Sequence, residues 1–299
     1  MPNHASADEI EKQLQGIKIP PQPQIMVDLH MEQAKPEPDL EVIADLICQD
    51  VGLSGSMLKI VNSASYGLAE PIASIRQAVM LMGMDQAITI INGLAIKGEM
   101  SDENIAFMNR FWDSAMDVAM TTTGLARSLS ISSPEDAYTL GLFHNCGVPL
   151  LYRRFKNYEA IAQQAYAYKS GRLIDLENQT FRTNHAVAGY YTARSWRVPD
   201  LICEVIAEHH NSLSQVCAGS GDTSEKATLF CLLKMAEHIC RCYQVIGQQS
   251  HDYEWEELEE PVLQHLGLSA YDFQNLQDQF AESGYGGSNY DGLTDSAIN

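Results

Sequence analysis

Helix start signals recur along most of this chain, and they restrict its fold more than any other feature. Asp39 stands directly before apolar residues at helical spacing, and Asn184 can begin a helix that runs to Trp196. Residues 133–136, Ser-Pro-Glu-Asp, combine an N-cap with a proline and two acids in the first turn. The sequence has no alternating apolar and polar runs between hairpin turns, the pattern of β-strands. It therefore predicts an all-α fold, a multi-helix bundle.

The same signals predict where other helices begin and end. Asp50 is expected to cap a helix, and Asn62-Ser63 followed by Gly67 is typical of a helix end and a turn. Further helices are expected over residues 78–96 behind a capping box at Ser74, from Pro199 to His210, over residues 227–245 behind Ser224, and from Ser269 onward. Residues 211–224 read as a long polar loop, and the acidic run 254–260 reads as a solvated helix face.

Charge restricts the partners of the chain. The 299 residues carry a formal net charge of −20, and residues 251–299 contain no Lys or Arg. An acidic surface repels phosphate backbones and anionic headgroups, so we expect neither nucleic acid nor membrane as a partner.

Hydropathy and cysteine usage indicate the compartment. The chain has no apolar run of membrane-spanning length, and its first residues are polar, without a signal-peptide pattern. Its seven cysteines include no Cys-x-x-Cys pair, which favours buried reduced thiols over disulfides or a zinc site. We therefore expect a cytoplasmic protein.

The chain carries a series of short motifs that occur in a fixed order from Ile19 onward. It includes Ile19-Pro-Pro-Gln-Pro, the Gln49-Asp50 pair, and the block Asn62-Ser-Ala-Ser-Tyr66-Gly67, and it continues later with Phe111-Trp112 and Gly141-Leu-Phe-His144. This series resembles the HDOD domain, a helical output module of bacterial signalling proteins that is related to the HD phosphohydrolases. The resemblance covers roughly residues 17–245.

The resemblance, with a shift in composition between Gly98 and Asn109, predicts two helical halves. We expect an N-terminal segment (1–16), an N-terminal helical half of the HDOD domain (17–100), an HD-like helical half (101–250), and an acidic C-terminal segment (251–299) with a disordered tail from Ser283.

The resemblance also implies a damaged metal site. HD phosphohydrolases hold their metal ions with a His, a His-Asp pair and a later Asp. In this chain Ser114 stands in place of the first His, His144 is retained, Asn145 replaces the Asp of the pair, and Glu237 replaces the last Asp. A neutral amide oxygen is a much poorer ligand for a hard divalent cation than a carboxylate. No catalytic residue and no metal or other cofactor are therefore expected.

Three more histidines can lie in the same pocket: His185, His209 and His210. One interpretation is that they are hydrogen-bonded pocket residues left from an ancestral site. A second is that these histidines, with His144 and Glu237, ligate a divalent transition metal such as zinc, nickel or iron. A third is a pocket for a small anionic ligand without chemistry.

Two functions follow from these alternatives. The first is a non-catalytic bacterial signal-transduction module that binds a signalling protein or a small ligand. The second is a metal-dependent phosphohydrolase that acts on a nucleotide or a cyclic dinucleotide and rebuilds its site from the remaining histidines and Glu237.

Overall fold

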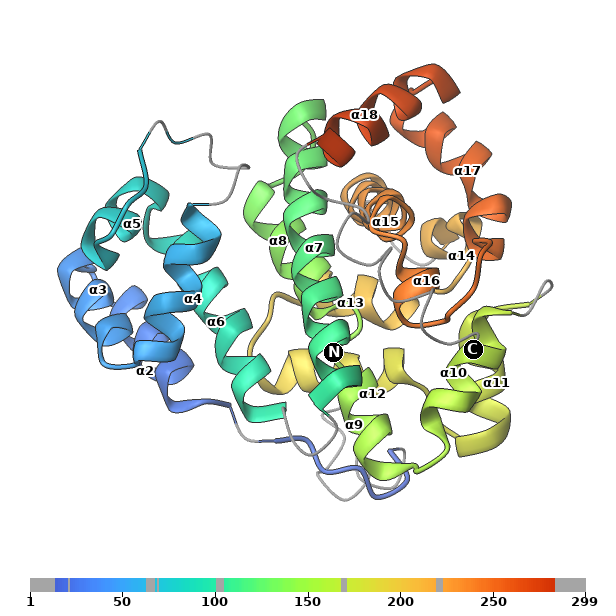
Figure 1. The fold of residues 1–299 in the computed structure, drawn as a ribbon, viewed down its shortest axis with the longest axis horizontal. Coiled ribbons are helices and arrows are strands. Elements are labelled where there is room, and N and C mark those ends of the chain that lie inside the picture. The colour runs from blue at the N-terminus through green and yellow to red at the C-terminus, as the bar shows by residue number, and fades with distance from the viewer. Residues whose placement is uncertain are drawn as a thin grey trace, which may run out of the picture. The chain divides into compact units, whose positions relative to one another are not determined.

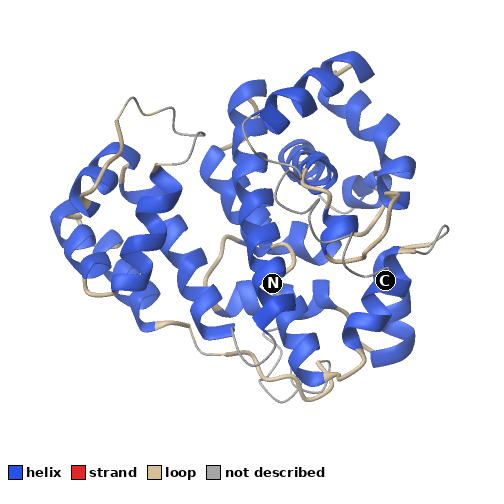
Figure 2. Ribbon diagram, in the orientation of Figure 1, coloured by secondary structure: helices blue, strands red, loops and turns tan. Residues whose placement is uncertain are grey.

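A computed structural model describes residues 14–20, 22–62, 68, 70–100, 105–167, 171–218 and 223–282. Throughout these ranges the regular secondary structure is helical and no strand occurs (Figures 1 and 2), so the all-α prediction is confirmed. The chain divides into two compact units. The small unit is residues 20–101, and the large unit combines residues 1–19 with residues 102–299.

Three helices of the small unit begin at caps that the sequence predicts, namely Asp39, Asp50 and Ser74. The elements are α2 (Gln24–Gln33), α3 (Leu40–Cys48), α4 (Val51–Val61), α5 (Ile75–Met82) and α6 (Met84–Met100). The Asp39 carboxylate accepts the Glu41 N–H at 2.8 Å, and that of Asp50 accepts the Leu53 N–H at 2.9 Å. Each cap satisfies a backbone donor that the first turn of a helix leaves without a partner.

Two helix ends in the small unit bear on the sequence predictions. The single helix predicted over residues 78–96 is wrong, because Gly83 adopts φ +80° and separates α5 from α6. Asn62 does end α4, and its side-chain amide exchanges two hydrogen bonds with the backbone of Ile72, at 2.7 and 2.8 Å. The turn expected at Ser63 to Gly67 lies outside the described residues.

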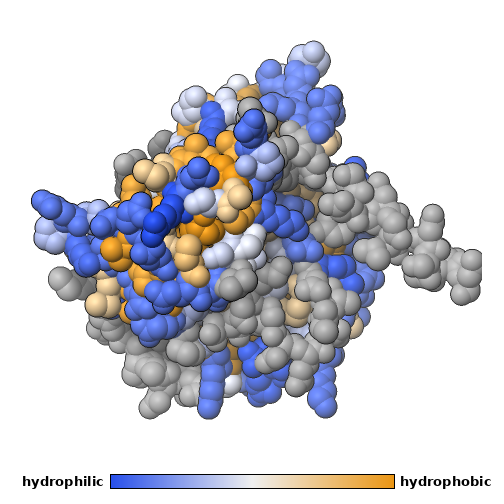
Figure 3. All heavy atoms as spheres, turned by 60° about the vertical axis from the view of Figure 1, so that its left-hand side comes forward, coloured by the Kyte–Doolittle hydropathy of each residue, from blue (hydrophilic) through white to orange (hydrophobic). Residues whose placement is uncertain are grey.

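Some large apolar side chains of the small unit face solvent. Met80 and Leu81, on α5, are 67% and 51% exposed, and Met31, on α2, is 67% exposed. Figure 3 shows apolar surface, in orange, on the face that is turned forward there.

The large unit is built around α15 (Thr223–Ile239), which Figure 1 shows almost end-on. Residues 229–233 of this helix are fully buried, so neighbours cover it on every side. The neighbours are α7 (Ile105–Leu129), α8 (Pro134–Phe143), α13 (Asp200–Glu208), α14 (Leu213–Ala218), α16 (Cys242–Val245) and α17 (Tyr253–Leu266). The remaining helices are α9 (Val148–Arg154), α10 (Tyr158–Tyr166), α11 (Leu173–Phe181), α12 (His185–Ser195) and α18 (Ala270–Glu282).

Helix boundaries in the large unit agree in part with the sequence. Ser133 caps α8 and Asn184 caps α12, as predicted. The helix expected over residues 227–245 is two helices, because Arg241 adopts φ +53° between α15 and α16. The predicted loop 211–224 is interrupted by α14, and the helix expected to reach His210 ends at Glu208. The expected tail from Ser283 lies outside the described residues.

Glycine lets two helices of the large unit approach closely. A Cβ atom on Gly147, at the start of α9, would lie 2.0 Å from the carbonyl oxygen of His185 and 2.7 Å from the backbone nitrogen of Gly189. Only a residue without a side chain fits at this position, so Gly147 allows α9 to lie against the first turn of α12, which carries His185.

Candidate functional site

The structure brings three of the predicted histidines together inside the large unit. His185 is the first residue of α12, and His209 and His210 follow the end of α13. One ring nitrogen of each lies within 4.8 Å of a ring nitrogen of the other two, and all three side chains are buried. We call these residues the histidine cluster.

Backbone carbonyls fix the ring orientation of two histidines at the site. The Nδ1 atom of His209 donates to the carbonyl oxygen of Ile206 at 2.7 Å, and that of His144 donates to the carbonyl oxygen of Gly141 at 2.6 Å. A carbonyl oxygen only accepts, so Nδ1 carries the proton. In the neutral imidazole this leaves Nε2 with a free lone pair.

Carboxylates fix the ring orientation of the other two histidines, His185 and His210. The Nδ1 atom of His185 donates to the carboxylate of Glu177 at 2.9 Å, and that of His210 donates to Glu254 at 2.7 Å. Glu177 is itself held by the Tyr158 hydroxyl and by the backbone N–H of His185, each at 2.8 Å. The Nε2 atoms of His185 and His210 then face each other at 2.9 Å.

Asn145 connects His144 to the histidine cluster. Its side-chain Nδ2 donates to Nε2 of His144 at 2.8 Å, and its Oδ1 lies 3.3 Å from Nε2 of His209. The amide that replaces the expected carboxylate is therefore a buried bridge between two rings.

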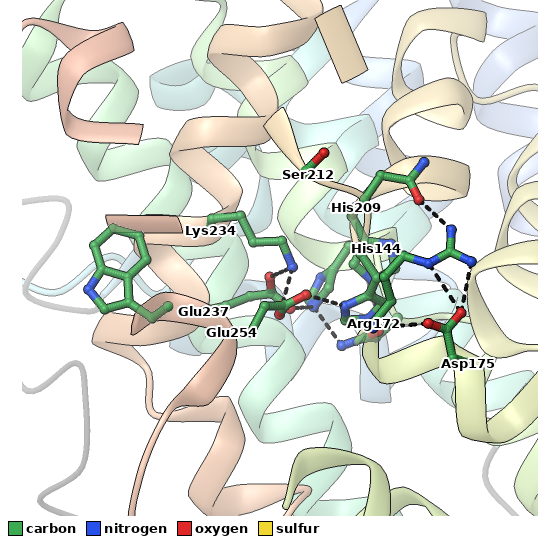
Figure 4. A network of polar contacts seen from close by, with 12 residues as sticks. His144, Arg172, Asp175, His209, Ser212, Lys234, Glu237 and Glu254 are labelled. Carbon is green, nitrogen blue, oxygen red and sulfur yellow. Dashed lines mark hydrogen bonds and ion pairs between the residues drawn. The ribbon is translucent and has the colours of Figure 1, made fainter. Parts of the chain in front are cut away.

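Lys234 controls the carboxylates of the site. Its ammonium lies 2.8 Å from Glu237 and 3.0 Å from Glu254. Figure 4 shows the Lys234 side chain directed toward both carboxylates. Burial alone would raise the pKa of Glu237, but the positive charge of Lys234 holds that pKa well below its ordinary value. Burial raises the pKa of Glu254, which Lys234 only partly offsets. Glu237 also lies 3.4 Å from Nε2 of His144.

The electrostatic environment keeps two rings of the cluster neutral. Burial lowers the pKa of His209 and of His210 well below the ordinary histidine value, and the positive charge of Lys234 adds to this effect. Near neutral pH both rings therefore offer an unprotonated Nε2.

A cavity of about 520 Å³ adjoins the cluster at His210. Arg172 lies at this cavity, where it pairs with Asp175 at 2.7 Å and donates to Asn211 at 2.9 Å (Figure 4). Four acidic residues line the cavity, against this single arginine: Asp175, Asp252, Glu254 and Glu257. Its walls therefore carry net negative charge.

Ser114 takes no part in the histidine network. Its hydroxyl hydrogen-bonds to the thiol of Cys242 at 3.5 Å, so it makes a buried contact between α7 and α16. His144, Asn145 and Glu237 do join the network around the cluster.

Three residues of the site were not predicted from the sequence, although two of them left a signal there. Glu177 shares the apolar face of α11 with Leu173, Ile174 and Phe181, and a lone carboxylate on such a face indicates a partner. Lys234 interrupts an apolar run and stands three residues before Glu237, on the same face of α15. The third is Glu254, whose neighbours along the chain gave no comparable signal.

The solvated helix face expected at residues 254–260 is wrong for part of that run. Glu254 is 29% exposed and bonds to His210 and Lys234, and Trp255 and Leu258 are buried. Glu254 could not be identified from the sequence, because nothing in the neighbouring residues distinguishes a carboxylate that reaches inward from the surrounding acids that face water.

Comparison with known proteins identifies the family. The profile of the HDOD domain matches residues 19–212, about two thirds of the chain. An HDOD domain protein from Geobacter sulfurreducens has the same fold, with a TM-score of 0.66 at 22% identity over 92% of this chain and 93% of that one. A protein from Shewanella amazonensis SB2B, provisionally named a phosphohydrolase, gives a TM-score of 0.65 at 20% identity over 94% and 95%.

Curated relatives match over shorter stretches. An uncharacterized protein from Treponema pallidum is 25% identical over 197 residues, which are 64% of this chain and 38% of the relative. The cyclic di-GMP phosphodiesterase CdgJ of Vibrio cholerae is 33% identical over 85 residues, 28% of this chain and 19% of that protein. The chain thus spans less than two fifths of the length of these relatives. With the profile match over most of its length, the chain belongs to the HDOD domain family.

Proposed function

We propose that this HDOD protein is a signal-transduction module that binds a partner protein or a small ligand and does not hydrolyse phosphate esters. The observation that carries the proposal is the pairing of Lys234 with Glu237 and Glu254. Both carboxylates already pair with a cation of the chain itself, so neither is free to bind a hard divalent ion at the reacting phosphate.

The residues that would complete an HD site support the same conclusion. Asn145 offers an amide in place of a carboxylate, and its nitrogen is already committed to His144. Ser114 faces Cys242. The HD ligand set therefore does not fit an HD-type metal centre in this chain.

The cavity beside the cluster also disfavours a phosphate ester. Its acidic residues would lie next to the phosphate of any substrate that approached His210. Two like charges about 4 Å apart repel by about 1 kcal/mol in water and about 4 kcal/mol in a partly buried site. In contrast, the exposed apolar side chains Met80 and Leu81 are suited to contact with another protein.

Hydrolysis assays test this function directly. The purified chain is incubated with bis(p-nitrophenyl) phosphate or cyclic di-GMP in the presence of Mg²⁺, Mn²⁺, Zn²⁺ or Ni²⁺. We expect no turnover above that of His144→Ala, because no carboxylate is available to complete a catalytic metal centre. The variant Asn145→Asp should also stay inactive, since Ser114 still stands in place of the first His. Turnover by the wild type that is lost in His144→Ala would establish a phosphohydrolase instead.

A further inference from the structure

The histidine cluster has the geometry of a metal-binding site. In each ring the Nδ1–H is held by an oxygen acceptor: Glu177 for His185, the carbonyl of Ile206 for His209, and Glu254 for His210. Protein metal sites use this arrangement because the outer hydrogen bond fixes the tautomer and raises the basicity of the ligating nitrogen.

The contacts between the rings bring lone pairs together, an arrangement that a shared cation would stabilise. Nε2 of His185 and Nε2 of His210 lie 2.9 Å apart, and neither nitrogen carries a proton in the tautomers just described. Oδ1 of Asn145 likewise faces Nε2 of His209 at 3.3 Å, so two acceptors meet there as well. Three nitrogens about 2.0–2.1 Å from one tetrahedral ion lie roughly 3.3 Å apart, close to the spacing of the first pair.

The charged side chains around the histidine cluster also favour a bound cation. Glu177, Glu237 and Glu254 are three acidic side chains at the histidine cluster, and the Lys234 ammonium pairs with two of them, Glu237 and Glu254. One ammonium therefore faces two of these three acidic side chains, and such surroundings suit a bound cation better than an anion.

We propose that His185, His209 and His210 bind one divalent transition-metal ion through their Nε2 atoms. Three imidazoles without a carboxylate ligand select zinc or a neighbouring first-row metal over magnesium or calcium. Because His210 lines the 520 Å³ cavity, the ion lies beside a space that a small ligand can enter. The inference goes beyond the proposed function, since a bound metal requires no hydrolysis.

Metal stoichiometry tests the site. The tag-free full-length chain is equilibrated with Zn²⁺, desalted and analysed by plasma mass spectrometry, and Co²⁺ binding is followed by its visible absorption. We expect one ion per chain, and at least a tenfold weaker affinity in His185→Ala and His210→Ala. His265→Ala is the matched control, because this exposed histidine on α17 lies outside the cluster and should leave binding unchanged.

A milder variant covers the case in which the histidine variants do not fold. Glu177→Gln keeps the size of the side chain but weakens the hydrogen bond to Nδ1 of His185, and loss of such an outer partner lowers metal affinity about 10- to 100-fold. Circular dichroism checks that this variant is folded. No uptake by the wild type would overturn the proposal, as would uptake that survives unchanged in both His210→Ala and Glu177→Gln and so belongs to other groups, such as the exposed Cys48. Neither outcome bears on hydrolysis, which the assays above decide separately.

Discussion

Lys234 is the residue on which the electrostatics of the site depend. Its side chain is 2% exposed, and its two carboxylate partners, Glu237 and Glu254, are 9% and 29% exposed. A buried ion pair of this kind adds little net stability over a well-packed apolar pair. Removing one partner is different, because the remaining charges stay buried without compensation.

We therefore expect Lys234→Met to be strongly destabilising. Loss of the ammonium should lower the free energy of unfolding by about 3–5 kcal/mol at neutral pH, measured by urea denaturation. Lys226→Met is the matched control on the same helix, because Lys226 is equally buried but its partners Glu204 and Glu208 are 52% and 33% exposed. Water can solvate those carboxylates, so the control should cost only about 1 kcal/mol.

The pH dependence of this difference has a definite sign. The folded-state pKa of Glu237 is lowered below its ordinary value of 4.5, so its pairing stabilises the fold above that pH and is lost as pH falls through the lowered pKa. The gap between wild type and Lys234→Met should therefore narrow below about pH 4.5. A gap that stays constant down to pH 3 would show that lost packing, and not lost charge, causes it.

At the scale of elements, the sequence predicts local features well and long-range ones poorly. The caps at Asp39, Asp50, Ser133 and Asn184 depend on neighbours within three residues, and each is found as predicted. The breaks at Gly83 and Arg241 depend on how the next helix packs. The helical spacing of apolar residues continues across both positions, so the sequence pattern did not predict either break.

The residues of the candidate site likewise divide into those that a local motif predicts and those that only long-range contacts reveal. His144, His185, His209, His210 and Glu237 could be named from motifs, and in the structure they lie close together, with His144 in contact with both Glu237 and His209. The contact of Glu254 with His210 joins residues 44 positions apart in sequence, and no local pattern reports such a distance. Ser114 could be named too, but only the fold shows that it faces Cys242.

Gly147 gives a prediction at the same scale, because it sets the approach of α9 to α12. In Gly147→Ala the new Cβ would overlap the carbonyl oxygen of His185, 2.0 Å away, and backbone cannot move aside as a flexible side chain can. We expect a loss of about 3 kcal/mol or more in the free energy of unfolding, with weaker metal uptake because His185 is displaced.

The matched control is Gly55→Ala, at an exposed position in α4. Nothing lies within 4 Å of its added Cβ, so the substitution should stabilise the protein by about 0.5–1 kcal/mol. Equal destabilisation by both variants would contradict the close-approach argument. Thermal unfolding monitored by circular dichroism distinguishes the two outcomes.

At the scale of the whole molecule, net charge influences which partners can approach. The net charge of −20 repels polyanions at long range. Among the described residues, no helix combines the length and the apolar composition of a membrane span. The charge favours a partner that is a protein or a neutral or cationic small molecule, as the proposed function requires.

This charge distribution predicts that the chain rejects the nucleotide named in the function of its relative from Vibrio cholerae. Cyclic di-GMP carries two phosphates, and the cavity beside His210 presents acidic residues, of which Glu257 is exposed. Calorimetric titration at physiological salt should therefore detect no binding tighter than about 100 µM, or roughly −5.5 kcal/mol. Glu257→Lys replaces repulsion by attraction at the cavity and should raise the affinity if electrostatics is the barrier. Tight binding by the wild type, unaffected by this variant and by salt, would mean that the nucleotide binds elsewhere on the chain and that the acidic cavity does not govern ligand choice.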